Sequence, residues 1–112
     1  MKRMVTMLVT PIMALAAMLG SVGSASAASL ETWDALAQCE SSGNWHINTG
    51  NGYYGGVQFS HRTWQAYGGG VFSYNAHGAT KGQQILIAEK VLADPNQGWG
   101  AWPACSREIG VR

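Results

Sequence analysis

The chain has 112 residues, with seven basic and six acidic side chains and a formal net charge of +1. This near balance, without a run of basic residues, argues against a nucleic-acid partner or an anionic lipid surface. The length suits one small domain, and a domain of this size has a modest core that a covalent cross-link often supports.

The N-terminal part has the pattern of a secretory signal peptide. A positively charged start is followed by an almost wholly apolar run, which is shorter than the roughly 20 residues of a membrane-spanning helix. Ala25 and Ala27 then fit the small-x-small rule for cleavage. We expect a signal peptide over 1–27, cut after Ala27 or, as the close alternative, after Ala28. The exported domain over 28–112 would carry no membrane anchor.

Two cysteines lie in this expected mature domain, one near each end. In an oxidising compartment Cys39 and Cys105 should pair. The bridge would close a loop of 65 intervening residues, which corresponds to about 4 kcal/mol in the chain-entropy model. Because two cysteines so far apart do not form a metal knuckle, we expect a disulfide and neither a metal nor another cofactor.

Short helices alternating with glycine-rich turns predict a small, mainly helical α+β domain. The first helix is expected over about 30–40, with Ser29 as its N-cap and Trp33, Leu36 and Glu40 on one face. A small β-hairpin or looped lobe is expected over 48–59, because Asn-Gly pairs stand there beside aromatic and β-branched residues.

The second half of the chain predicts two more helices. One begins after Ser60 as N-cap and ends at the glycines 68–70, and residues 71–79 are expected to form a loop. The other begins at Thr80 with a Thr-x-x-Gln capping box and runs to about Ala93. Its expected inner face consists of Ile85, Ala88, Val91 and Leu92. The Gly- and Trp-rich segment 97–105 would then return to the first helix.

Glu40 is the candidate for acid chemistry among the six carboxylates of the mature domain. The other five have ordinary explanations at helix termini, on exposed helix faces or in the C-terminal tail. Glu40 shares a face with Trp33 and Leu36, and it lies in the last turn, where the helix dipole disfavours a negative charge. We therefore expect a raised pKa, which suits a general acid. The pattern alone equally allows a glutamate that frays into solvent.

Other catalytic arrangements do not occur in the sequence. It contains no Gly-x-Ser-x-Gly elbow and no His-Glu-x-x-His helix. The three histidines stand 15 and 16 positions apart, which is not a spacing of metal ligands.

Three long segments resemble a known family. Segment 39–45 reads Cys-Glu-Ser-Ser-Gly-Asn-Trp, segment 48–59 reads Asn-Thr-Gly-Asn-Gly-Tyr-Tyr-Gly-Gly-Val-Gln-Phe, and segment 97–105 reads Gln-Gly-Trp-Gly-Ala-Trp-Pro-Ala-Cys. With Trp-Asp-Ala-Leu-Ala upstream and Thr-Trp at 63–64, they are similar to the catalytic domain of the resuscitation-promoting factors of actinobacteria. The resemblance covers about 32–105.

This resemblance implies a lysozyme-like, lytic-transglycosylase-like domain with one disulfide. It implies that Glu40 is the catalytic glutamate and that Tyr53, Gln58, Thr63 and Gln97 lie along the sugar cleft. The implied activity is cleavage of peptidoglycan glycan strands by a secreted cell-wall enzyme, which promotes wall remodelling and resuscitation of dormant cells. By analogy with the family, a peptidoglycan endopeptidase is a further partner. We expect a monomer.

Two positions depart from the family pattern. Ser42 stands where members commonly have glycine, and if that position needs a positive φ the serine costs on the order of 1 kcal/mol. Ser60 stands where some members have an acidic residue, so a second catalytic carboxylate cannot be placed there.

With one carboxylate, two routes to glycan cleavage stay open. Glu40 could protonate the glycosidic oxygen and then activate water, or it could activate the 6-hydroxyl of the muramic sugar and release an anhydro product. We favour the second route, because a tethered nucleophile has a high effective concentration. The alternative function is a secreted glycan-binding module that uses tryptophans and cuts nothing, or a diffusible growth signal. The tryptophans in question are Trp45, Trp64, Trp99 and Trp102.

Overall fold

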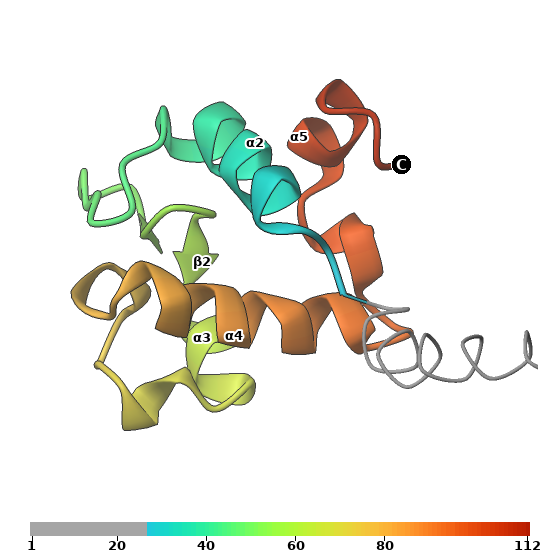
Figure 1. The fold of residues 1–112 in the computed structure, drawn as a ribbon. Helices are drawn as coiled ribbons and strands as arrows, with labels where there is room; N and C mark the ends of the chain where they lie inside the picture. Colours follow the sequence, from blue (N-terminus) through green and yellow to red (C-terminus); the bar gives the residue numbers. More distant parts are fainter. Residues whose placement is uncertain (1–26) are drawn as a thin grey trace, which may run out of the picture.

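The computed structural model describes residues 27–112, so the expected signal peptide lies outside the described residues except for Ala27. The described part contains four α-helices and one two-stranded antiparallel sheet (Figure 1). The helices are α2 (Leu30–Ser41), α3 (His61–Ala66), α4 (Lys81–Ala93) and α5 (Pro103–Glu108), and the strands are β1 (Tyr53–Tyr54) and β2 (Phe59–Ser60). The predicted α+β class with a short hairpin is confirmed.

Helix α4 crosses the middle of the domain, with α2 and α5 on one side of it and α3 on the other (Figure 1). Three of the helices contribute fully buried side chains to one core: Trp33 and Leu36 from α2, Trp64 from α3 and Ile87 from α4. Among residues 27–112, no helix is both long and apolar enough to cross a bilayer.

Helix α2 begins and ends as its sequence predicts. The Ser29 side chain accepts a hydrogen bond from the Thr32 amide, which caps the first turn. Ser42 follows the last turn with φ 56°, and the amides of Ser42 and Gly43 donate to Gln38 and Ala37. Position 42 thus does need a positive φ, which the sequence analysis left as a condition, and the serine adopts it without the freedom of glycine.

The hairpin forms in the expected segment, but its turn is elsewhere. Tyr53 pairs with Ser60 and Tyr54 with Phe59, so the turn consists of residues 55–58. The Asn-Gly pair at 51–52, which suggested the hairpin, precedes β1 instead. The side chain of Asn51 accepts a hydrogen bond from the Tyr53 amide, a local turn that leads the chain into the strand.

Helix α4 has the predicted capping box, with Thr80 and Gln83 each binding the other's backbone amide. Its inner face was only partly predicted. Ala88 and Val91 are buried as expected, whereas Ile85 and Leu92 are half-buried at the flanks. The face is completed by Ile87 and by a polar residue that hydrophobic periodicity cannot assign to the core, Gln84.

Two segments expected to be irregular contain short helices. Residues 71–79 were expected to be a loop, yet 3-10 turns occur at Gly69–Val71 and Ala76–Gly78. After a further turn at Gly98–Ala101, the tail forms α5 with Pro103 in its first turn, where the missing amide hydrogen does no harm.

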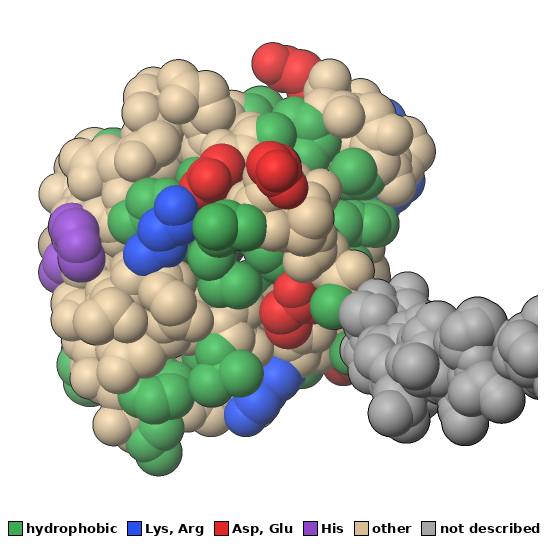
Figure 2. Space-filling model, viewed as in Figure 1, with side chains coloured by type: hydrophobic (Ala, Val, Ile, Leu, Met, Phe, Trp, Pro, Cys, Tyr) green, Lys and Arg blue, Asp and Glu red, His purple; other side chains and the backbone are tan. Residues whose placement is uncertain are grey.

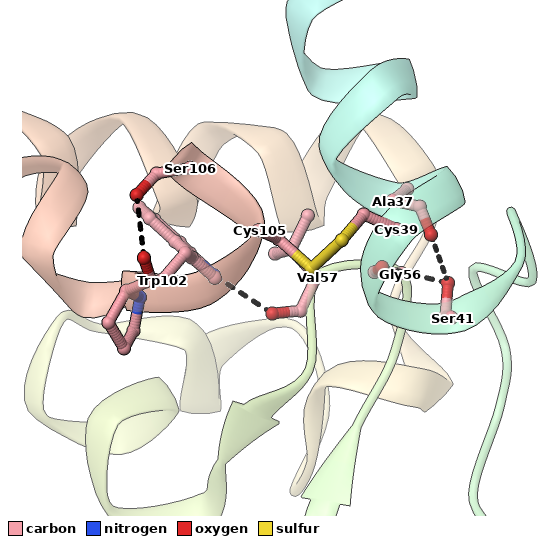
Figure 3. Close-up of a disulfide and its surroundings, with 9 residues drawn as sticks. Ala37, Cys39, Ser41, Gly56, Val57, Trp102, Cys105 and Ser106 are labelled. Carbon is pink, nitrogen blue, oxygen red and sulfur yellow. Dashed lines mark hydrogen bonds between the residues drawn. A yellow bond between two sulfur atoms is a disulfide. The ribbon is translucent and has the colours of Figure 1, made fainter. Parts of the chain in front are cut away.

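Helices α2 and α5 are joined by the predicted disulfide between Cys39 and Cys105, whose Cα atoms lie 5.8 Å apart (Figure 3). The bridge connects two helices that are 66 positions apart in the chain. It confirms the cysteine pairing expected from the sequence, and it brings the C-terminal tail against the end of α2 that carries Glu40.

Candidate active site

Two adjoining hollows lie along the hairpin: one of about 330 Å³, also lined by α2 and α5, and one of about 110 Å³, also lined by α3, α4 and the segment 97–102. Four residues line both hollows, namely Tyr53, Gln58, Ala101 and Trp102, so we describe the two together as the cleft. The larger hollow is completed by Glu40, Pro103, Ala104 and Cys105, and the smaller by Phe59, Ser60, Thr63, Val91 and Gln97.

All five residues assigned to the site by resemblance line this cleft. Glu40 lies in the larger hollow, Thr63 and Gln97 lie in the smaller one, and Tyr53 and Gln58 border both. They come from four separate parts of the chain, which the fold brings together. The roles of these residues stay predictions, since their arrangement alone does not assign them.

Glu40 is held at the end of α2 by its two neighbours in the sequence. Cys39 is bonded to Cys105 on α5, and the Ser41 hydroxyl is buried within hydrogen-bond distance of the carbonyl oxygens of Ala37 (3.0 Å) and Gly56 (2.8 Å) (Figure 3). The last turn of α2 is thus fixed to α5 on one side and to the hairpin turn on the other. The backbone that carries Glu40 has little freedom to fray.

The Glu40 side chain is half-buried at the edge of the apolar face of α2, beside the fully buried Leu36. Burial raises the pKa of this carboxyl above its ordinary value, because a partly desolvated carboxylate is less stable than the neutral acid. Among the described residues the carboxyl group has no hydrogen-bond donor and no cation within 4.0 Å to oppose this shift. The direction of the pKa shift predicted from the sequence is confirmed.

Glu40 is also the one carboxyl group that lines the cleft within residues 27–112. The remaining carboxylates lie outside it: Glu31, Asp34, Glu89, Asp94 and Glu108. The lining of the cleft therefore contains a single carboxyl group.

Gln58 is held in an unusual backbone conformation beside Glu40's hollow. Its φ is 58°, a left-handed value that non-glycine residues adopt at a cost of about 1 kcal/mol or more. Its side-chain amide donates to the Gly55 carbonyl oxygen at 3.1 Å, and its Oε1 lies 3.4 Å from Nδ2 of Asn51. Strain of this kind concentrates at functional sites, and it presents the amide at the boundary of the two hollows.

Trp102 lines both hollows, and the sequence analysis named it only in the alternative of a glycan-binding module. It is 4% exposed, and its indole Nε1 donates to the Val57 carbonyl oxygen at 2.9 Å. Trp102 thus ties the segment before α5 to the hairpin turn (Figure 3). Its place in the resembling segment 97–105 was the available signal. A buried tryptophan and a ligand-facing one have the same sequence pattern.

Among the described side chains that line the cleft, Glu40 is the one charged group. Within the described residues, no three His, Cys, Asp or Glu side chains lie close enough to hold a metal ion. On the face seen in Figure 2, acidic, basic and hydrophobic side chains are interspersed, and no large patch of one charge forms. The cleft thus provides one carboxylic acid, several neutral polar groups and aromatic rings.

Comparison with known proteins identifies the family. Residues 27–105 match the model of the transglycosylase-like domain family. The chain belongs to this family. The match covers the whole cleft, from Glu40 through the hairpin to Cys105, and it supports the lysozyme-like fold class predicted from the sequence.

The relatives are resuscitation-promoting factors, as the resemblance indicated. The chain is 61% identical to Rpf2 of Corynebacterium glutamicum over 82% of its own length and 24% of the relative's. It is 64% identical to Rpf1 of the same bacterium, over 79% of this chain and 45% of that one. It is 54% identical to Rpf of Micrococcus luteus, over 86% of this chain and 41% of that one. The chain thus spans less than half the length of these relatives.

Proposed function

We propose that this chain cleaves the glycan strands of peptidoglycan, with Glu40 as the catalytic acid. The observation that carries the proposal is the placement of Glu40, a half-buried carboxyl group with a raised pKa and no other carboxylate in its cleft. Protonation of a glycosidic oxygen needs an acid in its protonated form, and burial of Glu40 shifts its pKa in the direction that favours this form. Membership of the transglycosylase-like family points to the same reaction class.

The lone carboxyl group favours the anhydro-forming route. Hydrolysis in its usual forms uses two carboxylates, of which the second acts on water or on the sugar. Here Glu40 would first give its proton to the departing glycosidic oxygen. The resulting carboxylate would then remove the proton from the 6-hydroxyl of the muramic sugar, whose oxygen attacks its own anomeric carbon. The tethered hydroxyl has the high effective concentration of an intramolecular nucleophile and needs no second carboxylate.

The other four predicted site residues have suitable chemistry for binding the glycan. Tyr53 is 50% exposed, and its ring offers an apolar face on which a sugar can stack. The side-chain amides of Gln58 and Gln97 and the hydroxyl of Thr63 both donate and accept hydrogen bonds, as sugar hydroxyls require. We assign these residues to orientation of the strand, so that the bond to be cut lies against Glu40.

The alternative of a tryptophan-based binding module is disfavoured by burial. Four of the five tryptophans are at most 9% exposed, and the fifth, Trp99, is only partly exposed and packs on Trp33 and Trp102. Of the four tryptophans named for this alternative, only Trp102 lines the cleft, so they do not form a joint surface for a glycan. The exposed aromatic ring at the cleft is Tyr53.

The test is wall cleavage by the Glu40→Gln variant, measured as loss of turbidity of a peptidoglycan suspension. Glutamine keeps the shape of the side chain and removes the proton, so we expect cleavage to be abolished and the melting temperature to be unchanged or slightly higher. Glu31→Gln, at an exposed position in the first turn of α2, is the matched control and should cleave like the wild type. Residual lysis by Glu40→Gln close to that of the wild type would remove Glu40 from its role.

Mass spectrometry of the digest separates the two routes. Anhydro-muramic ends indicate the intramolecular route, and reducing ends with an added water indicate hydrolysis. A chain that binds walls without releasing either product would be a binding module, and a growth effect that survives Glu40→Gln would indicate a signal.

We also propose that the chain acts outside the cell, on the wall, and promotes the resuscitation of dormant cells. The signal-peptide pattern and the names of the relatives support this part of the proposal. Addition of exported wild-type protein to dormant cultures should shorten the lag before growth, and the Glu40→Gln variant should not. The endopeptidase partner and the monomeric state stay predictions from the family resemblance.

A further inference from the structure

Glu89, on α4, accepts a hydrogen bond from the backbone of Ala28, near the start of the described residues. Its carboxylate lies with Oε2 at 3.2 Å and Oε1 at 3.4 Å from the backbone nitrogen of Ala28. The same Oε2 accepts a hydrogen bond of 2.8 Å from Nε1 of Trp33, whose ring is fully buried. Both carboxylate oxygens thus face one nitrogen atom, which in an unprocessed chain has only a single hydrogen to donate.

This carboxylate has no cationic partner among the described residues. The one ion pair within 4.0 Å in residues 27–112 joins Lys81 to Asp34. The positions three and four residues away from Glu89 on α4 are apolar: Ile85, Leu86, Leu92 and Ala93. On α2 the group that faces it is the indole of Trp33, and Trp99, which packs against that indole, is also uncharged.

We propose that Glu89 is the binding site for the α-ammonium group that leader cleavage creates at Ala28. Hydrolysis of the bond between Ala27 and Ala28 adds water, leaving a carboxyl group on Ala27 and an amine on Ala28 that takes up a proton near neutral pH. The nitrogen then has three hydrogens and a positive charge, at a position where two carboxylate oxygens already lie within 3.4 Å. The proposal rests on cleavage after Ala27, and it is independent of the wall-cleaving function.

The proposal fits one of the two cleavage sites that the sequence left open. Cleavage after Ala27 places the new charge on the nitrogen that Glu89 already contacts. Cleavage after Ala28 would remove that nitrogen from the mature protein and would place the charge on Ser29, whose side chain caps α2.

The ion pair would support the aromatic cluster behind the cleft. Trp33 lies with ring centroids 5.4 Å from Trp99 and 5.5 Å from Trp102, and Trp102 lines both hollows. An ammonium group paired with Glu89 would hold in place the carboxylate oxygen that accepts the hydrogen bond from the Trp33 indole. The exported form would therefore be more stable than its precursor, which has only an amide at this position.

The test uses the full-length gene, exported by a host and processed there. Intact mass should place the N-terminus at Ala28. A variant with Gly-Ser inserted between Ala27 and Ala28 keeps the cleavage pattern but moves the charge two residues away from Glu89. We expect this insertion to lower the melting temperature by about 4 °C. In the Glu89→Gln background, where Oε1 can still accept from Trp33, the same insertion should have no effect.

A second measurement reports the charge itself. In the wild type, NMR titration of the Ala28 amine should give a pKa above the usual value of about 7.7 to 8.0, and Glu89→Gln should return it to that range. A raised pKa in the folded state means that this stabilisation is full below the usual value and is lost as pH rises through the raised one.

Three results would overturn the proposal. They are an N-terminus at Ser29, an insertion that lowers the melting temperature equally in both backgrounds, and an Ala28 amine with an ordinary pKa. The last would mean that Glu89 makes only a structural hydrogen bond.

Discussion

The two sides of the cleft are held in place by different kinds of interaction. The side that carries Glu40 is built from α2 and α5, which a disulfide joins. Trp33 of α2 also packs against Trp102, the residue directly before α5. The opposite side is built from a hairpin with two residues in each strand and from the short helix α3. Helices complete their own backbone hydrogen bonds, whereas a hairpin of this size is at best marginal by itself.

The hairpin side depends on side chains of the core that bind its backbone. Gln84 of α4 accepts from the Gly56 amide at 3.0 Å and donates to the carbonyl oxygens of Trp45 (2.8 Å) and Ala79 (3.0 Å). The glycine at 55 permits this approach, because a Cβ there would lie 2.3 Å from Oε1 of Gln84. Regular structure supports one side of the cleft, and a few buried polar contacts support the other.

Removal of the disulfide, which supports the Glu40 side, is expected to cause the largest loss of stability. Replacing both Cys39 and Cys105 by alanine should lower the free energy of unfolding by about 4 kcal/mol, because the loop between them is no longer closed in the unfolded state. Urea unfolding measures the loss, and reduction of the wild type should match it. Equal stability of the oxidised and reduced wild type would mean that the disulfide does not stabilise the Glu40 side of the cleft.

The next largest effect is expected from Gln84→Leu. Leucine fills similar space but leaves the Gly56 amide and two carbonyl oxygens unpaired, so we expect a loss of about 3 kcal/mol. Hydrogen exchange at Gly56 should become faster, while amides in the middle of α2 stay protected. Gln38→Leu, at an exposed position of α2 without a side-chain hydrogen bond, is the control and should change little. Uniform loosening of α2 and the hairpin would remove the distinction between the two sides.

A smaller effect is expected where α2 ends beside Glu40. Ser42→Gly should raise stability by up to about 1 kcal/mol, because glycine adopts the observed φ of 56° without a Cβ clash. Part of this gain is offset by the greater freedom of glycine in the unfolded chain. Thermal unfolding measures the difference, and Ser29→Gly, at an N-cap with extended backbone, should show no such gain. A clear loss on Ser42→Gly would mean that the serine makes a compensating interaction.

The smallest predicted effect is the pH dependence of cleavage and stability that Glu40 causes. Because burial raises the pKa of Glu40, the acid form persists above the ordinary value of 4.5, and cleavage should fall as pH rises through the raised pKa. The same shift means that wild-type stability declines over this interval relative to Glu40→Gln, which cannot ionise. Initial rates and melting temperatures across pH check both trends. A Glu40 that titrates at or below its ordinary value would contradict them.

The sequence determined the features that depend on neighbouring residues. Ser29, Ser60 and Thr80 are the N-caps it predicts, because a cap needs only a hydroxyl two or three positions before the amide that it binds. The cysteine pairing followed from there being only two. The cleft residues were named through the resemblance, and composition or periodicity alone left even the role of Glu40 undecided.

Only the tertiary structure decided which distant residues meet. The buried Gln84 and Trp102 bind the turn at 55–58 through hydrogen bonds to Gly56 and Val57, which are 28 and 45 positions away, and such contacts leave no local periodicity. Helix α5 escaped prediction because it begins without a side-chain N-cap, whereas the equally short α3 has Ser60 as a cap signal. Glu89 looked like an ordinary glutamate on a helix face. Its contact with Ala28 spans 61 positions and exists only because α2 packs its tryptophan against α4.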